Sequence, residues 1–297
     1  MLVVENVSHG FGARTILEDV SFRIRKGEHI ALVGPNGEGK SSFLNIITMR
    51  QMPDAGDIKW SNRVTVGYLD QHTVLEKGKT IREILRDAFK HMFDLEKEML
   101  EIYDKMGEAS DEEMSKYLED TAEIQTMLEH SGFYTIDAKI QEVANGLGLG
   151  DLGLDKDVTD LSGGQRTKVL LTKLLLENPT ILVLDEPTNY LDIEARSWLE
   201  LWLKKFTGGF LLVSHDRSFL DATVNETYEL FNGTLKRYAG TYTNYEKTRE
   251  VELASLIKAY AQQQLEIAKT EDFIRKFRYK ATKAAAVQDR VKRLEKL

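Results

Sequence analysis

The chain has 297 residues, 42% of them apolar, which is enough for one large or two modest domains with a buried core. It contains no cysteine, so disulfides and thiolate metal sites are excluded. The net charge of −8 argues against a general polyanion binder, and no apolar run approaches the ~18 residues that cross a bilayer, so we expect a cytoplasmic protein without membrane insertion.

Charge is distributed unevenly along the sequence. Residues 273–297 contain nine Lys or Arg and two acids, a net of +7, whereas residues 87–129 contain fourteen acids and four Lys, a net of −10. An asymmetry of this size indicates binding partners that the overall charge does not reveal.

Short strands are predicted in the first part of the chain. The β-rich or apolar runs are residues 2–7, 20–24, 29–33, 57–60 and 64–68. The third run leads into the octet Gly34-Pro35-Asn36-Gly37-Glu38-Gly39-Lys40-Ser41, and residues 41–49 are predicted to form a helix. The octet has the form G-x-x-x-x-G-K-[ST] of a phosphate-binding loop.

This octet supplies the groups that a nucleoside triphosphate needs. Its glycines let backbone N–H groups wrap the phosphates, and the following helix points its positive end at them. Lys40 offers a cation to the β and γ phosphates and Ser41 a hydroxyl to Mg²⁺, with Ser42 next to it. We therefore expect nucleotide and Mg²⁺ along residues 34–42.

The middle of the chain is predicted to be helical. Apolar residues spaced three and four apart predict one amphipathic helix over residues 81–106 and a second over residues 114–128. Ser110 and Glu113 form a capping-box pattern before the second helix, and a third helix covers residues 137–147. The first two form an acidic αα-hairpin, whose acidic face is either a binding surface or only a solvated one.

Strands and helices alternate after residue 160. Helices are predicted over residues 166–177 and 193–206, and apolar strands over residues 181–184 and 210–213. This alternation predicts an α/β fold with a largely parallel sheet that binds its ligands at the carboxyl ends of the strands.

Five side chains outside the octet are candidates for the same site. Asp185 ends a predicted strand and either contacts Mg²⁺ through water or caps a helix, and Glu186 could act as the general base. His215 also follows a strand, which favours a γ-phosphate contact over a structural role. Gln71 follows a predicted strand and either belongs to the site or is an ordinary exposed loop amide, and Phe11 either stacks on adenine or fills a loop.

The end of the chain differs in composition from the rest. From residue 243 onward there is no glycine, proline or strand pattern, which predicts a long helix or a helix pair. The cations with interleaved aromatic residues favour a polyanion contact, with an exposed helical face as the alternative. The candidate RNA contacts are Arg275, Lys276, Arg278, Lys280 and Lys283.

These motifs, in this order, resemble those of the ATP-binding-cassette superfamily over residues 1 to about 240. The octet resembles its first motif, the strand ending at Asp185-Glu186 its acidic strand, and Gln71 and His215 its Q-loop and switch histidine. The signature and D-loop are matched by Leu161-Ser162-Gly163-Gly164-Gln165 and Asn189-Tyr190-Leu191-Asp192. The resemblance implies a P-loop ATPase core, a mainly parallel sheet with an antiparallel β subdomain, and an inserted helical subdomain.

The resemblance also implies roles for individual residues. Ser41, Gln71 and Asp185 would hold Mg²⁺, Glu186 would activate water, and His215 would position the γ-phosphate of ATP. The signature residues Ser162, Gly163, Gly164 and Gln165 would close over ATP held by a second cassette rather than over their own.

Within the superfamily the chain resembles ABC-F proteins. Two sequence motifs resemble those of that group, Leu184-Asp185-Glu186-Pro187-Thr188-Asn189 and Ser214-His215-Asp216-Arg217. The basic tail resembles the group's interdomain linker. ABC-F proteins bind the ribosomal E site, act on translation and reach toward the P-site tRNA. The resemblance therefore implies a ribosome partner, through rRNA and tRNA.

The chain departs from the ABC-F pattern at two points. It has one glycine loop and one signature where that group has two cassettes, so we expect the N-terminal half of a longer protein. Its partner would be a second cassette in cis or a second copy, and hydrolysis by the lone cassette would be weak. Tyr190 also stands where many members have His, which leaves the D-loop contact open.

The expected domains are an ATPase core over residues 1–78 and 160–242, a helical subdomain with the acidic arm over 79–159, and a basic linker over 243–297. The main hypothesis is ATP binding and hydrolysis coupled to ribosome binding and to regulation of translation. The alternatives are an ATP-hydrolysing subunit of a membrane transporter, a nucleotide-gated binding module, or a ribosome-protection antibiotic-resistance factor.

Overall fold

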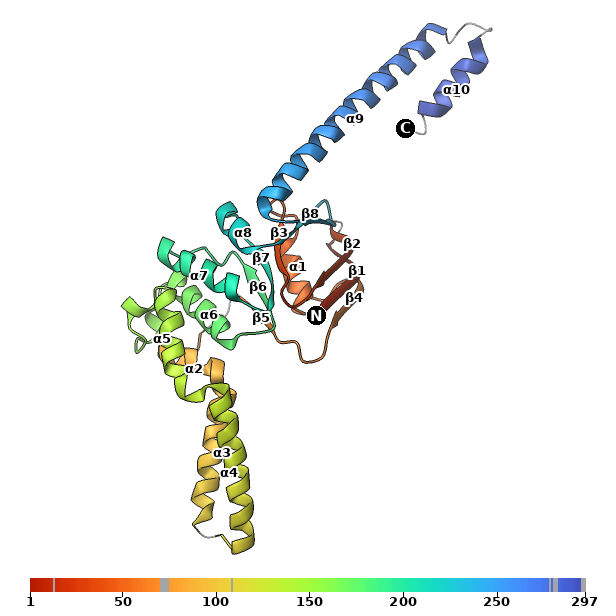
Figure 1. Ribbon diagram of the computed structural model, residues 1–297. Coiled ribbons are helices and arrows are strands. Elements are labelled where there is room, and N and C mark those ends of the chain that lie inside the picture. The colour runs from red at the N-terminus through yellow and green to blue at the C-terminus, as the bar shows by residue number, and fades with distance from the viewer. Residues whose placement is uncertain (13, 70–74, 108, 278, 280–282, 295–297) are drawn as a thin grey trace. The chain divides into compact units, whose positions relative to one another are not determined.

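The computed structural model describes residues 1–297 except 13, 70–74, 108, 278, 280–282 and 295–297 (Figure 1). The chain divides into two compact units, Met1–Tyr242 and Thr243–Leu297. No described helix combines the length and apolar character that a membrane span requires.

A three-stranded antiparallel sheet opens the first unit. Its strands, in spatial order, are β2 (Arg14–Ile24), β1 (Leu2–Phe11) and β4 (Ala55–Trp60). β1 and β2 are longer than the sequence patterns predict, because their pairing continues to Phe11 opposite Arg14 at the hairpin turn. The longer hairpin places the Phe11 ring at the end of the sheet.

A six-stranded sheet forms the centre of the unit. Its strands, in spatial order, are β5 (Val66–Tyr68), β6 (Ile181–Asp185), β7 (Gly209–Val213), β3 (His29–Val33), β8 (Glu226–Phe231) and β9 (Thr234–Ala239). All neighbours are parallel except β8 and β9. β6 and β7 are buried at almost every position, as expected for parallel strands that are covered on both faces. The predicted α/β class is confirmed.

One hydrophobic core joins the two sheets. Helix α1 (Lys40–Ile47) contributes Phe43, Leu44, Ile46 and Ile47, all fully or almost fully buried. The Phe43 ring meets the Phe22 ring of β2 edge to face, with 5.4 Å between the centroids. Because α1 follows the glycine loop directly, this core also fixes the loop.

Three helices lie around the large sheet: α6 (Gly163–Glu177), α7 (Ile193–Lys205) and α8 (Arg217–Thr223).

The sequence patterns assigned no element to the region of α8, β8 and β9. The β8–β9 hairpin nevertheless has a local signal, because Asn232 and Gly233 adopt positive φ angles of 47° and 74°, as a two-residue Asn-Gly turn requires.

The predicted helix over residues 81–106 is wrong as a single element. It consists of α2 (Ile81–Arg86), the 3₁₀ turn η1 (Asp87–Phe89) and α3 (Lys90–Met106). α2 and η1 pack on α6, whereas α3 pairs with α4 (Asp111–Ser131) and has no buried residue. The apolar stripe changes its packing partner at the break, which is why one periodicity spans two helices.

The acidic hairpin of α3 and α4 extends away from the sheets (Figure 1). The predicted capping box is confirmed, since the Ser110 side chain accepts from the Glu113 backbone N–H and the Glu113 carboxylate accepts from the Ser110 N–H, at 3.0 Å. The region is completed by η2 (Phe133–Thr135), α5 (Ile136–Gly146), η3 (Gly150–Leu152) and η4 (Val158–Asp160).

The second unit is a helix pair, one of the two arrangements that the composition predicts. It contains α9 (Tyr242–Phe277) and α10 (Ala284–Leu294), which folds back along the end of α9. The Arg290 guanidinium lies 3.7 Å from the centroid of the Phe273 ring, and Val287 is buried between the helices.

Helix α7 contains one buried and one exposed leucine, which allows a controlled test of its packing. Leu199 is fully buried and Leu201, two residues on, is 58% exposed. Leu199→Ala should lower the free energy of unfolding by ~2–5 kcal/mol, because it leaves a cavity. Leu201→Ala should change it by less than ~0.5 kcal/mol. Urea denaturation of both variants measures the difference, and equal losses would contradict the packing of α7.

Candidate active site

The glycine loop lies tightly against two strands. A Cβ atom added to Gly34, where φ is 149°, would stand 2.2 Å from the carbonyl oxygen of Leu230 in β8. One added to Gly39, where φ is 100°, would stand 2.2 Å from Ile16 Cγ2 in β2. Only glycine fits at either place, so these positions are required by packing as well as by backbone geometry.

Two side-chain hydrogen bonds brace the outer part of the loop. Arg14 Nη2 donates to the carbonyl oxygen of Gly37 at 3.0 Å, and the N–H of Asn232 donates to Glu38 Oε2 at 2.9 Å. The β8–β9 turn and the start of β2 therefore hold the loop from both sides. Helix α1 has no side-chain cap, so its first N–H groups remain available to an anion.

Lys40 sits inside the loop. Its Nζ donates to the carbonyl oxygens of Gly34, at 2.8 Å, and Pro35, at 3.0 Å. Partial burial lowers the pKa of Lys40, while the nearby charges of Glu186 and Asp185 oppose that shift. The loop thus presents a positive charge among backbone donors, as a bound phosphate group requires. The exposed residues Pro35 and Asn36 and the half-buried Ser42 complete the predicted set around it.

Ser41 and Asp185 are brought together from distant parts of the chain. The Ser41 hydroxyl donates to Asp185 Oδ2 at 3.1 Å. Burial raises the pKa of Asp185, although the Ser41 hydrogen bond and the Lys40 charge oppose the shift. A hydroxyl beside a carboxylate fits Mg²⁺, which takes one or two protein oxygens and completes its shell with phosphate and water. The described residues contain no group of three His, Asp or Glu side chains that could hold the metal alone.

Glu186 and His215 face each other at the same edge of the sheet. His215 Nε2 lies 3.6 Å from Glu186 Oε1, which is too far for a hydrogen bond but close enough for attraction when the imidazole is protonated. The Glu186 backbone is held in the left-handed region, with φ of 48°, by an N–H···O bond of 2.9 Å to Val213.

The environment of the Glu186 carboxylate is unusual. Its side chain is 17% exposed, and Oε1 is one of few buried side-chain atoms among the described residues with no hydrogen bond. Burial raises the pKa of Glu186, partly offset by His215. Because buried polar atoms normally have partners, an orphaned carboxylate oxygen at a strand end fits a group that acts on a ligand.

Phe11 and Gln71 differ in what the structure shows. Phe11 is 57% exposed, and its ring and the His9 ring meet in a T-shaped arrangement with 5.1 Å between the centroids. Its stacking on adenine stays a prediction. Gln71 lies outside the described residues.

The signature residues form the start of α6. Ser162 Oγ accepts from the Gln165 N–H at 3.3 Å, and Gln165 Oε1 accepts from the Ser162 N–H at 2.9 Å, which is a capping box. Gly163 has open space around it, and Gly164 lies against the Tyr190 ring. No hydrogen bond or ion pair of these four described residues reaches the glycine loop.

Two ion pairs near the site were not predicted from the sequence. Lys168 Nζ of α6 lies 3.0 Å from Asp192 Oδ2, and Arg196 of α7 pairs with Asp216, at 2.7 Å for Nη1–Oδ2. The only sequence signals were the positions of the two acids, since Asp192 ends the D-loop pattern and Asp216 follows His215.

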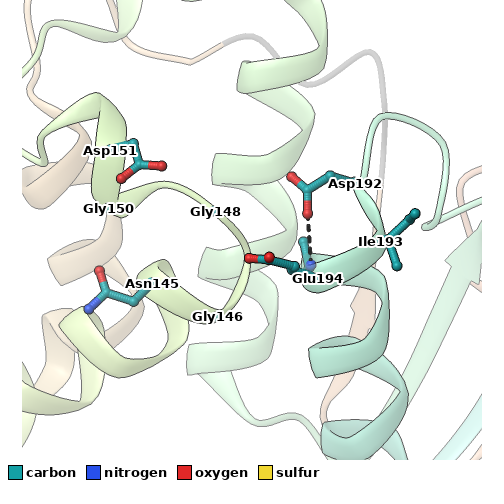
Figure 2. Close-up of a pocket in the computed structure, with 9 residues that line it drawn as sticks. Asn145, Gly146, Gly148, Gly150, Asp151, Asp192, Ile193 and Glu194 are labelled. Atoms are coloured by element: carbon teal, nitrogen blue, oxygen red, sulfur yellow. Dashed lines mark hydrogen bonds between the residues drawn. The ribbon is translucent and has the colours of Figure 1, made fainter.

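A surface pocket of about 840 Å³ lies between the end of α5 and the start of α7 (Figure 2). Asn145, Asp151 and Glu194 lie around it, and the carboxylate of Asp192 accepts a bond from the Ala195 N–H at 2.8 Å. It contains no residue of the glycine loop, so the candidate chemistry gathers at the sheet edge and not in this pocket.

The candidate RNA contacts lie on the second unit. Arg275 and Lys276 both pair with Asp272, at 2.6 Å, and their side chains are 81% and 65% exposed. Lys283 is exposed, whereas Arg278 and Lys280 lie outside the described residues.

Two family models, both described as ABC transporter, match residues 17–189 and 228–297. The chain is 52% identical to the uncharacterized ABC transporter ATP-binding protein YfmM of Bacillus subtilis, over 100% of this chain and 57% of that protein. It is 33% identical to ABC transporter F family member 2 of Arabidopsis thaliana, over 99% of this chain and 44% of that protein. The chain thus spans about half the length of these curated relatives.

A solved structure shares the fold. It is the ATP-binding cassette MJ0796, a dimer in a post-hydrolysis state bound to ADP and Pi. It aligns with a TM-score of 0.54 at 22% identity, over 80% of this chain and 98% of that one.

The burial of Glu186 predicts a pH-dependent effect on stability. Its pKa in the folded chain is raised above the ordinary value of 4.5, so the folded chain holds this proton more tightly than the unfolded chain does. The tighter binding of this proton therefore adds to the free energy of unfolding in full below pH 4.5, and the addition is lost as the pH rises through the pKa of Glu186 in the folded chain. Gln does not titrate, so Glu186→Gln should become more stable relative to the unmodified chain as the pH rises.

Urea midpoints measured from pH 4.5 upward, without nucleotide or metal, give the comparison. The control is Asp151→Asn, the same change of carboxylate to amide at an exposed position. If the difference in urea midpoint between Glu186→Gln and the unmodified chain stayed constant across the pH range, the raised pKa would be contradicted.

Proposed function

This chain belongs to the ABC transporter family of ATP-binding cassettes, and we propose that it couples ATP hydrolysis to ribosome binding and to the regulation of translation. The observation that carries the hydrolytic part is the approach of Glu186 and His215 beside the Ser41–Asp185 pair. The ribosomal part is supported by the F-family relative and by the basic helix pair of the second unit.

Each group at the sheet edge has a role in this proposal. The loop N–H groups and Lys40 bind the phosphates, and Ser41 and Asp185 hold Mg²⁺, which neutralises charge on the phosphates. Glu186 takes the proton of the attacking water, a task for which a carboxylate with a raised pKa is suited. His215 positions the γ-phosphate.

The proposal requires a second cassette to complete the site. In the described part of the chain, the signature residues make no hydrogen bond with their own glycine loop, and Gly163 has open space around it. In this proposal they close over a nucleotide held by another cassette. MJ0796, a cassette of the same fold, is dimeric with bound ADP and Pi. The partner is a second copy of this chain or a second cassette of a longer protein.

The proposed division of labour follows the regions of the chain. Residues 1–78 and 160–242 form the nucleotide-binding core, residues 79–159 the helical subdomain with its acidic arm, and residues 243–297 the basic linker. Among the described residues, the ion pairs of Arg275 and Lys276 are with Asp272, and exposed pairs of this kind are weak and exchange readily for RNA phosphates.

The composite site can be tested by complementation. Glu186→Gln removes the base and should slow hydrolysis by about 100-fold or more while ATP still binds. Gly163→Glu adds a charge where the chain itself has room, so it should block closure over the partner's γ-phosphate without disturbing the fold. A mixed dimer of the two variants keeps one intact site, so mixing them should restore part of the activity.

Steady-state ATPase measurements on each variant alone and on the mixture give the result. The rate per chain of the unmodified protein should also rise with protein concentration. Full activity of Gly163→Glu, or a rate per chain independent of concentration, would contradict a composite site.

Ribosome binding can be tested by co-sedimentation. Glu186→Gln holds ATP unhydrolysed, so it should pellet with ribosomes more strongly in ATP than in ADP. Adding Arg275→Glu and Lys276→Glu should weaken this roughly tenfold and flatten its salt dependence. Lys258→Glu, at an exposed position of the same helix, is the control and should keep binding. Equal pelleting of Glu186→Gln in ATP and in ADP would contradict the proposed coupling. Recovery of the protein with membranes instead of ribosomes would favour the alternative, an ATP-hydrolysing subunit of a membrane transporter.

A further inference from the structure

Asp216, the residue after His215, is fixed on several sides. Its carboxylate meets Arg196 through two contacts, Nη2–Oδ1 at 3.0 Å and Nη1–Oδ2 at 2.7 Å. The same Oδ1 accepts the Phe219 N–H at 3.1 Å and so caps α8, while the Asp216 N–H donates to Ser214 Oγ at 3.1 Å. The pair is largely shielded, with 34% of Arg196 and 24% of Asp216 exposed.

A two-pronged pair of this kind sets orientation as well as distance. A guanidinium and a carboxylate that share two parallel bonds lie in one plane, which a lysine cannot reproduce. His215 itself is 65% exposed, and its described ion-pair contact is with Glu186 at 3.6 Å. The position of its imidazole therefore depends on how firmly the backbone beside it is held.

Arg196 also links this loop to the signature helix. It lies one turn after Asp192, and its N–H donates to the Asp192 carbonyl oxygen at 2.9 Å. Asp192 in turn caps α7 and pairs with Lys168 of α6 at 3.0 Å. The first turn of α7 is thus tied at one end to the helix that begins with the signature and at the other to the loop that carries His215.

We propose that Arg196 is a positioning residue for ATP hydrolysis, which holds His215 beside Glu186 through its paired contacts with Asp216. This inference rests on the proposed function of the site, because it assigns Arg196 an effect only through His215. Among the described residues, no hydrogen bond or ion pair of Arg196 or Asp216 reaches the glycine loop, so the inference assigns the pair no part in nucleotide binding.

The test is a set of variants in the complete chain, measured as kcat and KM for ATP. Arg196→Gln should lower kcat by about 10-fold to 100-fold, the scale of a misplaced catalytic group, with KM unchanged. Arg196→Lys should lie between this variant and the unmodified chain, because it keeps the charge but not the two-pronged geometry. Lys204→Gln removes a comparable ion pair, with Glu200, farther along α7 and should leave kcat unchanged.

A double variant separates positioning from simple destabilisation. If Arg196 acts through His215, then Arg196→Gln combined with His215→Gln should be no slower than His215→Gln alone. The inference would be overturned if the fold-losses in kcat of the two single variants multiplied in the double variant. A raised KM at unchanged kcat in Arg196→Gln would also overturn it. Full activity of Arg196→Gln with loss in His215→Gln would overturn it too, and would leave the proposed function standing. Full activity of His215→Gln would remove the assigned role of His215, and the inference with it.

Discussion

Two carboxylates stand half-buried where strand β6 ends, and the arrangement around them depends on keeping opposite charge nearby. Burial raises the pKa of both Asp185 and Glu186 and lowers that of Lys40, so it disfavours all three charges. The charge of Lys40 opposes the shift at each acid, and the charges of the two acids oppose the shift at Lys40. The strand order β6-β7-β3 satisfies this constraint, because it brings the ends of three parallel strands to one edge. β3 delivers the glycine loop and Lys40, β6 delivers the two acids, and β7 leads to His215.

The small antiparallel sheet and the β8–β9 hairpin serve the same edge. Gly34 packs on the backbone of β8 and Gly39 on Ile16 of β2, at distances that admit no side chain. Arg14 and the Asn232 N–H hold the outer loop. A phosphate-binding loop must present its N–H groups in a fixed arrangement to bind without paying for reorganisation. Here that fixity comes from long-range packing on two sheets and not from the loop sequence alone.

What the sequence could predict follows from how local each feature is. The octet, the apolar strands before Asp185 and His215, and the Ser110–Glu113 capping box are short patterns, and their placement could be predicted. The break in the helix near Asp87 could not, because the apolar spacing continues while the packing partner changes from α6 to α4. The Arg196–Asp216 pair joins residues twenty positions apart, so only the packed structure reveals it. The roles assigned to the site residues remain predictions.

The strained geometry of Glu186 shows how the fold retains an unfavourable group. A left-handed backbone and an orphaned carboxylate oxygen both raise the free energy of the folded chain. They persist because the next strand over-determines the position: Asp185 pairs in register with Val213, and the Glu186 N–H bonds to the carbonyl oxygen of that same residue. β7 therefore anchors Glu186 through its last residue and His215 through the segment that follows. Arg196 holds the same segment through Asp216, so His215 is kept near Glu186 by β7 on one side and by α7 on the other.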